Sequence, residues 1–88
     1  MDDNLIRQAC YELLAQTKGE KTLSFAEVDD ATEIYGAGFD LDSLELTGLI
    51  VNIEKRFGIE VRDDEYFEAD TFENFGALCR FVSKKVTR

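Results

Sequence analysis

The sequence is organised around a short acidic run that leads into an amphipathic pattern. The run reads Asp40-Leu41-Asp42-Ser43-Leu44-Glu45-Leu46. Asp42 or Ser43 can cap the free backbone N–H groups at the start of a helix, where the helix dipole also favours acidic side chains. We therefore predict a helix from about Ser43 to Phe57, ended by Gly58 and roughly 22 Å long. Its expected buried face consists of apolar residues at helical spacing: Leu46, Leu49, Ile50, Ile53 and Phe57.

Two other long segments have the same amphipathic character. The first runs from about Asn4 to Thr17, and the last opens at Asp70-Thr71. An acidic segment over residues 63–68 is expected to form a short third helix. We therefore expect one all-α domain spanning residues 1–88, a bundle of three long helices and one short helix. The expected core residues of the first and last helices are Leu5, Ile6, Ala9, Cys10, Leu13, Leu14, Phe72, Phe75, Leu78 (or Cys79) and Val82.

A long loop is expected between the first two helices. From Glu20 to Asp42 the apolar residues lose their clean periodicity, although a short helical turn is expected within residues 25–30. Loops of this length in compact domains are usually functional or held down by their own apolar residues. The expected anchors are Phe25, Val28, Ile34 and Phe39.

The charge distribution disfavours several classes of partner. The net charge is -9, with six acidic residues and no base over residues 27–42 and seven acidic residues against one base over residues 60–73. Such a field repels nucleic acid and anionic lipid and attracts basic protein surfaces, although acidic loops also simply keep a small protein in solution. No apolar run is long enough to span a membrane and no secretory signal is evident, so a cytoplasmic protein is expected.

The residue types that most catalytic and metal sites need are missing. The sequence has no His, which removes a Ser-His-Asp triad and a Cys–His pair. Cys10 and Cys79 are too few to bind zinc, and we expect buried free thiols rather than a disulfide. The residues after Asp40 do not match a calcium loop, and Gly36-Ala37-Gly38 lacks the third glycine of a dinucleotide site, so no metal or nucleotide is expected. Ser43 is left either as a helix cap or as a residue that another enzyme modifies.

The run around Ser43 resembles the phosphopantetheine attachment motif of acyl and peptidyl carrier proteins, whose centre is Asp-Ser-Leu. The matching residues are Gly38-Phe39-Asp40-Leu41-Asp42-Ser43-Leu44-Glu45-Leu46, and the similarity extends from Ile34 to about Val82. The resemblance implies a four-helix carrier protein that is not an enzyme. A separate phosphopantetheinyl transferase would esterify the Ser43 hydroxyl with 4′-phosphopantetheine from coenzyme A. The thiol of that arm would carry acyl or aminoacyl groups as thioesters.

The resemblance also implies which surface partner enzymes contact. The helix that begins at Ser43 would be recognised by the transferase, by an acyl- or aminoacyl-loading enzyme and by downstream synthase or transferase enzymes. Asp42 would help to position a metal ion or the transferase during loading. The protein itself is expected to be a monomer. The expected contact residues are Asp42, Leu44, Glu45, Thr47, Gly48, Glu54 and Lys55.

Departures from the family pattern indicate the type of carrier. Carriers of bacterial fatty-acid synthesis usually have a strongly acidic recognition helix, whereas here Gly48 stands at a position that is often acidic and Lys55-Arg56 follow Glu54. This neutral helix favours a discrete acyl carrier of polyketide or other specialised-metabolite biosynthesis. A peptidyl or aminoacyl carrier of a nonribosomal pathway and a fatty-acid carrier are the alternatives. An alternative of another class is an unmodified acidic helical module that binds a basic protein.

Overall fold

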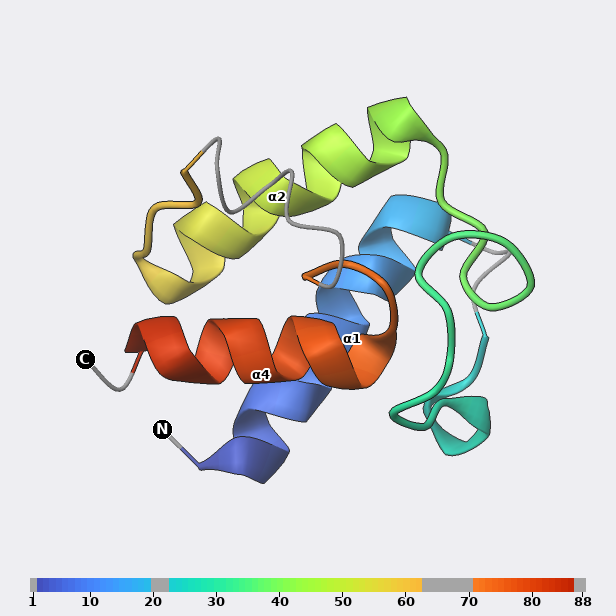
Figure 1. Cartoon of the computed structure of the whole chain (residues 1–88), viewed down its shortest axis with the longest axis horizontal. Helices are drawn as coiled ribbons and strands as arrows, with labels where there is room; N and C mark the ends of the chain where they lie inside the picture. The colour runs from blue at the N-terminus through green and yellow to red at the C-terminus, as the bar shows by residue number, and fades with distance from the viewer. Residues whose placement is uncertain (1, 20–22, 63–70, 87–88) are drawn as a thin grey trace.

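The computed structural model describes residues 2–19, 23–62 and 71–86. Its helices are α1 (Asp3–Lys18), α2 (Ser43–Phe57) and α4 (Phe75–Val86), with a short 3-10 helix, η2 (Phe25–Glu27), in the loop after α1. Helix α1 packs against both α2 and α4, and the long loop covers one end of the three helices (Figure 1). Among the described residues the only β-type pairing is an isolated bridge between Glu33 and Asn74. The expected all-α fold is confirmed, and the short helix expected at residues 63–68 lies outside the described residues.

Helix α1 forms where the sequence predicts it, but one residue of its predicted buried face is exposed. The side chain of Asp2 caps the helix by accepting a hydrogen bond from the Asn4 N–H at 3.0 Å. The prediction for Leu5 is wrong, because 55% of this residue is exposed. Leu5 lies one position, or about 100°, away from Ile6, outside the stripe that faces α2 and α4. The buried residues are Ile6, Ala9, Cys10, Leu13 and Leu14.

Helix α2 has the predicted bounds and the predicted core face. Leu46, Leu49, Ile50 and Ile53 are buried, and Phe57 is half-buried at the helix end. Gly58 follows in the left-handed conformation with φ of 65°, and its N–H donates to the Glu54 carbonyl at 2.9 Å. This is the usual helix ending for which glycine is selected.

Helix α4 begins at Phe75, so the prediction that it opens at Asp70-Thr71 is wrong. The residues just before it bind the long loop instead: the Ile34 N–H donates to the Glu73 carbonyl at 3.4 Å and the Phe75 N–H to the Thr32 carbonyl at 2.8 Å. The Asn74 side chain then accepts from the Ala77 N–H at 2.8 Å and takes the capping role. The predicted core residues of this region are nevertheless all buried: Phe72, Phe75, Leu78, Cys79 and Val82.

The long loop is held by three of its four predicted anchors. Ile34 and Phe39 are buried and Val28 packs partly against the core. Phe25 is 49% exposed and stacks edge-on against Tyr11, with ring centroids 5.1 Å apart, so its prediction as a core anchor is wrong. Leu41, which was not among the predicted anchors, is buried beside the start of α2.

Candidate functional site

Asp42, and not Ser43, caps helix α2. The Asp42 carboxylate accepts a hydrogen bond from the Glu45 N–H at 2.8 Å, and the Glu45 carboxylate accepts one from the Asp42 N–H at 3.1 Å. This reciprocal pair is a capping box, which satisfies two of the N–H groups that the start of a helix leaves without partners. The sequence allowed either residue to cap the helix, and the structure assigns the capping role to Asp42.

The Ser43 hydroxyl is therefore left for other chemistry. Ser43 is the first residue of α2 and is exposed. Within the described part of the chain its hydroxyl forms no hydrogen bond, although its backbone carbonyl accepts one from the Thr47 hydroxyl at 3.0 Å. A solvent-facing hydroxyl at the N-terminus of a helix lies where backbone N–H groups and the helix dipole favour a phosphate.

Backbone hydrogen bonds within the long loop hold the residues that precede Ser43. The Phe39 N–H donates to the Glu33 carbonyl at 2.8 Å, and the Leu41 N–H donates to the Ile34 carbonyl at 3.0 Å. Phe39 and Leu41 are both buried, so alternate residues of this segment are held in the core. The exposed Asp40 between them has φ of 55°, a left-handed conformation that Asp tolerates better than most residues. The loop therefore holds Asp42 and Ser43 in a defined position at the start of α2.

Lys18, which the sequence did not single out, connects the end of α1 to this site. Its Nζ donates to the Asp40 carbonyl at 3.0 Å and pairs with the Glu45 carboxylate at 3.2 Å. Only 12% of the Lys18 side chain is exposed. Glu45 therefore serves both the capping box and the link to α1. A lone lysine at a helix end gives no signal in the sequence, because its two partners are 22 and 27 residues away.

We expect Lys18→Met to destabilise the site more than the rest of the fold. Methionine keeps the length of the apolar stem but removes both charge-assisted hydrogen bonds, which together contribute about 1–3 kcal/mol. Urea unfolding measures the global loss, and amide hydrogen exchange at Leu41 and Glu45 measures the local one. Glu45→Gln is the matched control, because it retains an oxygen for the capping box while removing the charge. Unchanged exchange in Lys18→Met would contradict the role of this link.

The predicted contact residues do not all lie on the surface. Leu44 is 81% exposed, and Asp42, Thr47, Gly48 and Lys55 are also exposed. Glu45 and Glu54 are half-buried and bound within the chain. The Glu54 carboxylate accepts a hydrogen bond from the Val61 N–H at 2.9 Å.

A stripe of exposed residues starts beside Ser43 and follows α2. Leu44, Gly48, Val51 and Lys55 succeed one another at intervals of four, three and four residues, so they share one face of the helix. Val51, 41% exposed, was missed because its apolar side chain suggested no surface role. We call these four residues the α2 outer stripe. It runs from an apolar side chain beside the serine to a basic side chain near the end of the helix.

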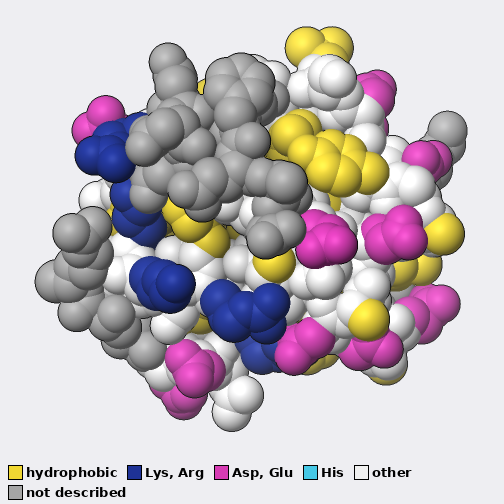
Figure 2. All heavy atoms as spheres, in the orientation of Figure 1, with side chains coloured by type: hydrophobic (Ala, Val, Ile, Leu, Met, Phe, Trp, Pro, Cys, Tyr) yellow, Lys and Arg dark blue, Asp and Glu magenta, His cyan; other side chains and the backbone are white. Residues whose placement is uncertain are grey.

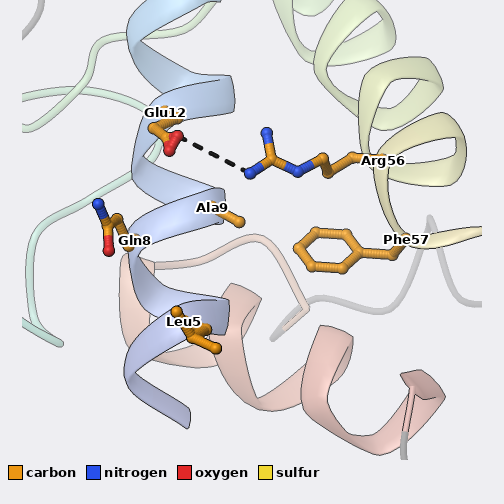
Figure 3. Close-up of a pocket in the computed structure, with 6 residues that line it drawn as sticks. All are labelled: Leu5, Gln8, Ala9, Glu12, Arg56 and Phe57. Atoms are coloured by element: carbon orange, nitrogen blue, oxygen red, sulfur yellow. Dashed lines mark ion pairs between the residues drawn. The ribbon is translucent and has the colours of Figure 1, made fainter. Parts of the chain in front are cut away.

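The end of α2 forms a separate shallow groove with α1. The groove has a volume of about 340 Å³ and is lined by Leu5, Gln8, Ala9, Glu12, Arg56 and Phe57. Leu5 and Phe57 lie on its two sides, and an ion pair between Glu12 and Arg56 spans it at 3.8 Å (Figure 3). Both charged side chains are more than 40% exposed, so this pair contributes little stability. The groove lies at the opposite end of α2 from Ser43.

The described residues hold no cluster of side chains that would bind a metal. No helix in that part of the chain is long and apolar enough to cross a membrane. Cys10 and Cys79 are both buried and free, as predicted. The Ser43 hydroxyl, at the start of α2, is therefore the exposed group that a modifying enzyme can reach.

Comparison with known proteins gives matches that include this site. The family model described as "Phosphopantetheine attachment site" matches residues 20–79. Acyl carrier proteins from two strains of Tropheryma whipplei, Twist and TW08/27, are each 33% identical to this chain over 66 residues. That alignment covers 75% of this chain and 71% of each relative.

Proposed function

We propose, because this chain belongs to the phosphopantetheine attachment family, that it is an acyl carrier whose arm is attached to Ser43. The cofactor of this family is 4′-phosphopantetheine, bound covalently, and its members are carriers rather than catalysts. The assignment to Ser43 rests on one observation, which is that the neighbouring Asp42 caps α2. Asp42 caps the helix, which leaves the neighbouring hydroxyl exposed and unbonded among the described residues.

The residues around Ser43 fit a phosphodiester on that hydroxyl. The first turn of α2 supplies free N–H groups and the positive end of the helix dipole. The buried Phe39 and Leu41 and the Lys18 link hold the preceding loop, so the hydroxyl has a fixed position for a transferase. When the cofactor is bound, its terminal thiol carries acyl groups as thioesters, and the flexible tether raises their effective concentration at a docked enzyme.

The α2 outer stripe is the proposed docking surface for the transferase and for acyl-loading enzymes. Leu44 is its main apolar contact, because it is the most exposed large apolar side chain described and is adjacent to Ser43. Gly48 exposes helix backbone to a partner, and Lys55 closes the stripe with a positive charge. An exposed leucine at the start of such a strip suits an apolar pocket on a partner enzyme.

We expect Leu44→Asp to lower kcat/KM for modification by the transferase by roughly tenfold or more, as for loss of an apolar anchor. The substitution is on the surface, so the melting temperature should change little. Leu5→Asp is the matched control: Leu5 is also more than half exposed but belongs to the groove at the other end of α2. Equal rates for Leu44→Asp and the wild type would remove Leu44 from the docking surface.

The charge of α2 supports a specialised pathway over general fatty-acid synthesis. Glu45 and Glu54 balance Lys55 and Arg56, so the helix is neutral. Its two acidic side chains bind Lys18 and the Val61 N–H and are less available to a basic enzyme. A partner for this surface would need an apolar and uncharged or acidic contact area, as opposed to a strongly basic one.

The assignment to Ser43 is tested by incubating the folded protein with coenzyme A and a broad-specificity phosphopantetheinyl transferase. We expect the intact mass to rise by one phosphopantetheinyl group, and fragmentation to place it on the peptide that contains Ser43. An unchanged mass in a sample whose circular dichroism shows a folded helical protein would contradict the proposal.

A further inference from the structure

A second pocket lies between α1 and α4, away from Ser43, and a cysteine forms part of its wall. The pocket has a volume of about 310 Å³. Cys79 of α4 lines it and retains 7% of its surface exposed, whereas Cys10 of α1 is completely buried. Of the two cysteines, only Cys79 is among the residues that line the pocket.

The pocket carries more basic than acidic side chains. Arg7 from α1 and Arg80 and Lys84 from α4 line it, against Asp3 from α1 and Asp30 from the long loop. Arg7 pairs with Asp30 and lies over the Phe75 ring, 5.0 Å from its centroid. Figure 2 shows Lys and Arg side chains over α4, while acidic side chains crowd the half of this face that the long loop occupies. The carrier site explains none of these positive charges.

Cys10 and Cys79 belong to the same buried cluster behind this pocket, where α1 packs against α4. A hydrogen bond from Cys10 lowers the pKa of Cys79, burial raises it, and the positive charges of Arg7 and Arg80 lower it further against the opposing charge of Asp30. The same hydrogen bond, followed by burial, raises the pKa of Cys10, which Arg7 and Arg56 only partly offset. The positive charges of Arg7 and Arg80 thus favour the ionised form of the Cys79 thiol, and the thiolate is the nucleophile in disulfide exchange.

We propose that Cys79 is a modification site for small anionic disulfides such as oxidised glutathione, and that Cys10 is its resolving thiol. The Cys79 thiolate attacks one sulfur of the disulfide, whose S–S bond breaks and releases one glutathione thiolate. Cys10 then loses its proton to that thiolate or to water and attacks the Cys79 sulfur. This step forms the Cys10–Cys79 disulfide and releases the second glutathione. The protein loses two hydrogen atoms, and the disulfide reagent is reduced to two thiols.

The basic side chains that line the pocket determine whether an anionic or a cationic disulfide reacts faster with Cys79. An anionic disulfide gains from Arg80 and Lys84, whereas a cationic disulfide is repelled by them, and both effects weaken with salt. The pocket admits part of such a reagent next to Cys79, while Cys10 is reached only through Cys79 because it has no exposed surface. The order of attack follows from this difference in access.

The test compares oxidised glutathione with cystamine, a cationic disulfide, on the protein lacking the phosphopantetheine arm. We expect oxidised glutathione to react faster at low salt and to yield a protein lighter by two hydrogen atoms, with peptide mapping linking Cys10 to Cys79. Cys10→Ala should stop at a stable glutathione adduct on Cys79, and Cys79→Ala should not react. Arg80→Gln should slow the reaction with oxidised glutathione by roughly two- to fivefold but not the reaction with cystamine.

Controls separate this result from unfolding and from net charge. Lys85→Gln removes the same charge as Arg80→Gln from a residue outside the pocket lining, and should leave the rate nearly unchanged. Melting curves confirm that each cysteine variant is folded. An adduct on Cys10 in folded Cys79→Ala, or a faster reaction of the wild type with cystamine than with oxidised glutathione, would overturn the proposal. The outcome is independent of Ser43, because Ser43→Ala retains both thiols.

Discussion

Replacement of Ser43 by alanine is expected to abolish the mass gained on incubation with coenzyme A and a phosphopantetheinyl transferase. The substitution removes the only oxygen on this side chain, so no phosphodiester can form there. It should also leave stability within about 0.5 kcal/mol of the wild type, because Asp42 retains the capping box with Glu45. Intact mass measures loading and urea unfolding measures stability. Together they separate loss of the attachment point from loss of the fold.

Ser24→Ala is the matched control for this result. Ser24 is also exposed and lies just before the short helix η2, and its hydroxyl donates a hydrogen bond to the Glu27 carboxylate at 2.8 Å. Its loss should cost more local structure than the loss of the Ser43 hydroxyl, yet loading should proceed in full. A full mass gain in folded Ser43→Ala would place the arm on another residue. A lost gain in Ser24→Ala would show that folding of the loop, and not the serine hydroxyl, limits the reaction.

The helices could be predicted from the sequence because their signals are local. Apolar residues three and four positions apart define the buried faces of α1 and α2, and Gly58 marks the end of α2. The same local signal could not choose between Asp42 and Ser43 as the cap. Both side chains offer an oxygen at nearly the same place in the chain, and only the orientation of the Asp42 carboxylate toward the Glu45 N–H decides between them.

Two of the errors lie where contacts distant in the sequence override local patterns. The residues at and just before the start of α4 form hydrogen bonds with Thr32 and Ile34, so that helix begins only at Phe75. Phe25 remains on the surface because it stacks on Tyr11 of α1. In each case the deciding partner lies more than ten residues away, beyond the reach of a periodicity argument.

The candidate site shows the same division. Ser43 and Leu44 were identified from a local motif, whereas Lys18 and Val51 were not. Lys18 matters because folding brings the end of α1 to Asp40 and Glu45. Val51 matters because the core stripe of α2 passes through its neighbours Ile50 and Ile53 and leaves it outside. Such roles depend on which face of a helix is already covered.

The second large effect is expected at Gly38, four residues before Asp42. A Cβ added there would lie 2.0 Å from the Glu33 carbonyl oxygen and 2.7 Å from the Glu33 nitrogen. Both atoms are backbone, and the same Glu33 carbonyl accepts the hydrogen bond from Phe39 that holds the loop. Gly38→Ala must therefore move the loop, at a cost of about 2–3 kcal/mol or more. For a domain of this size each kcal/mol lowers Tm by roughly 4–8 °C.

Gly48→Ala provides the opposite result from the same chemical change. A Cβ at Gly48 would meet no atom within 4 Å apart from the adjacent backbone of its own helix, and the residue is in the middle of α2. Alanine should therefore stabilise the protein by about 0.5–1 kcal/mol through helix propensity. Thermal unfolding measures the melting temperatures of the two variants, and the rate of phosphopantetheine transfer measures the effect on the site around Ser43. Because the Gly38 loop leads directly to Ser43, Gly38→Ala should slow transfer even at temperatures where the protein stays folded. Wild-type stability in Gly38→Ala would mean that the close approach of Gly38 to Glu33 does not hold this loop, and that Ser43 is positioned by Lys18 and the buried Phe39 and Leu41 alone.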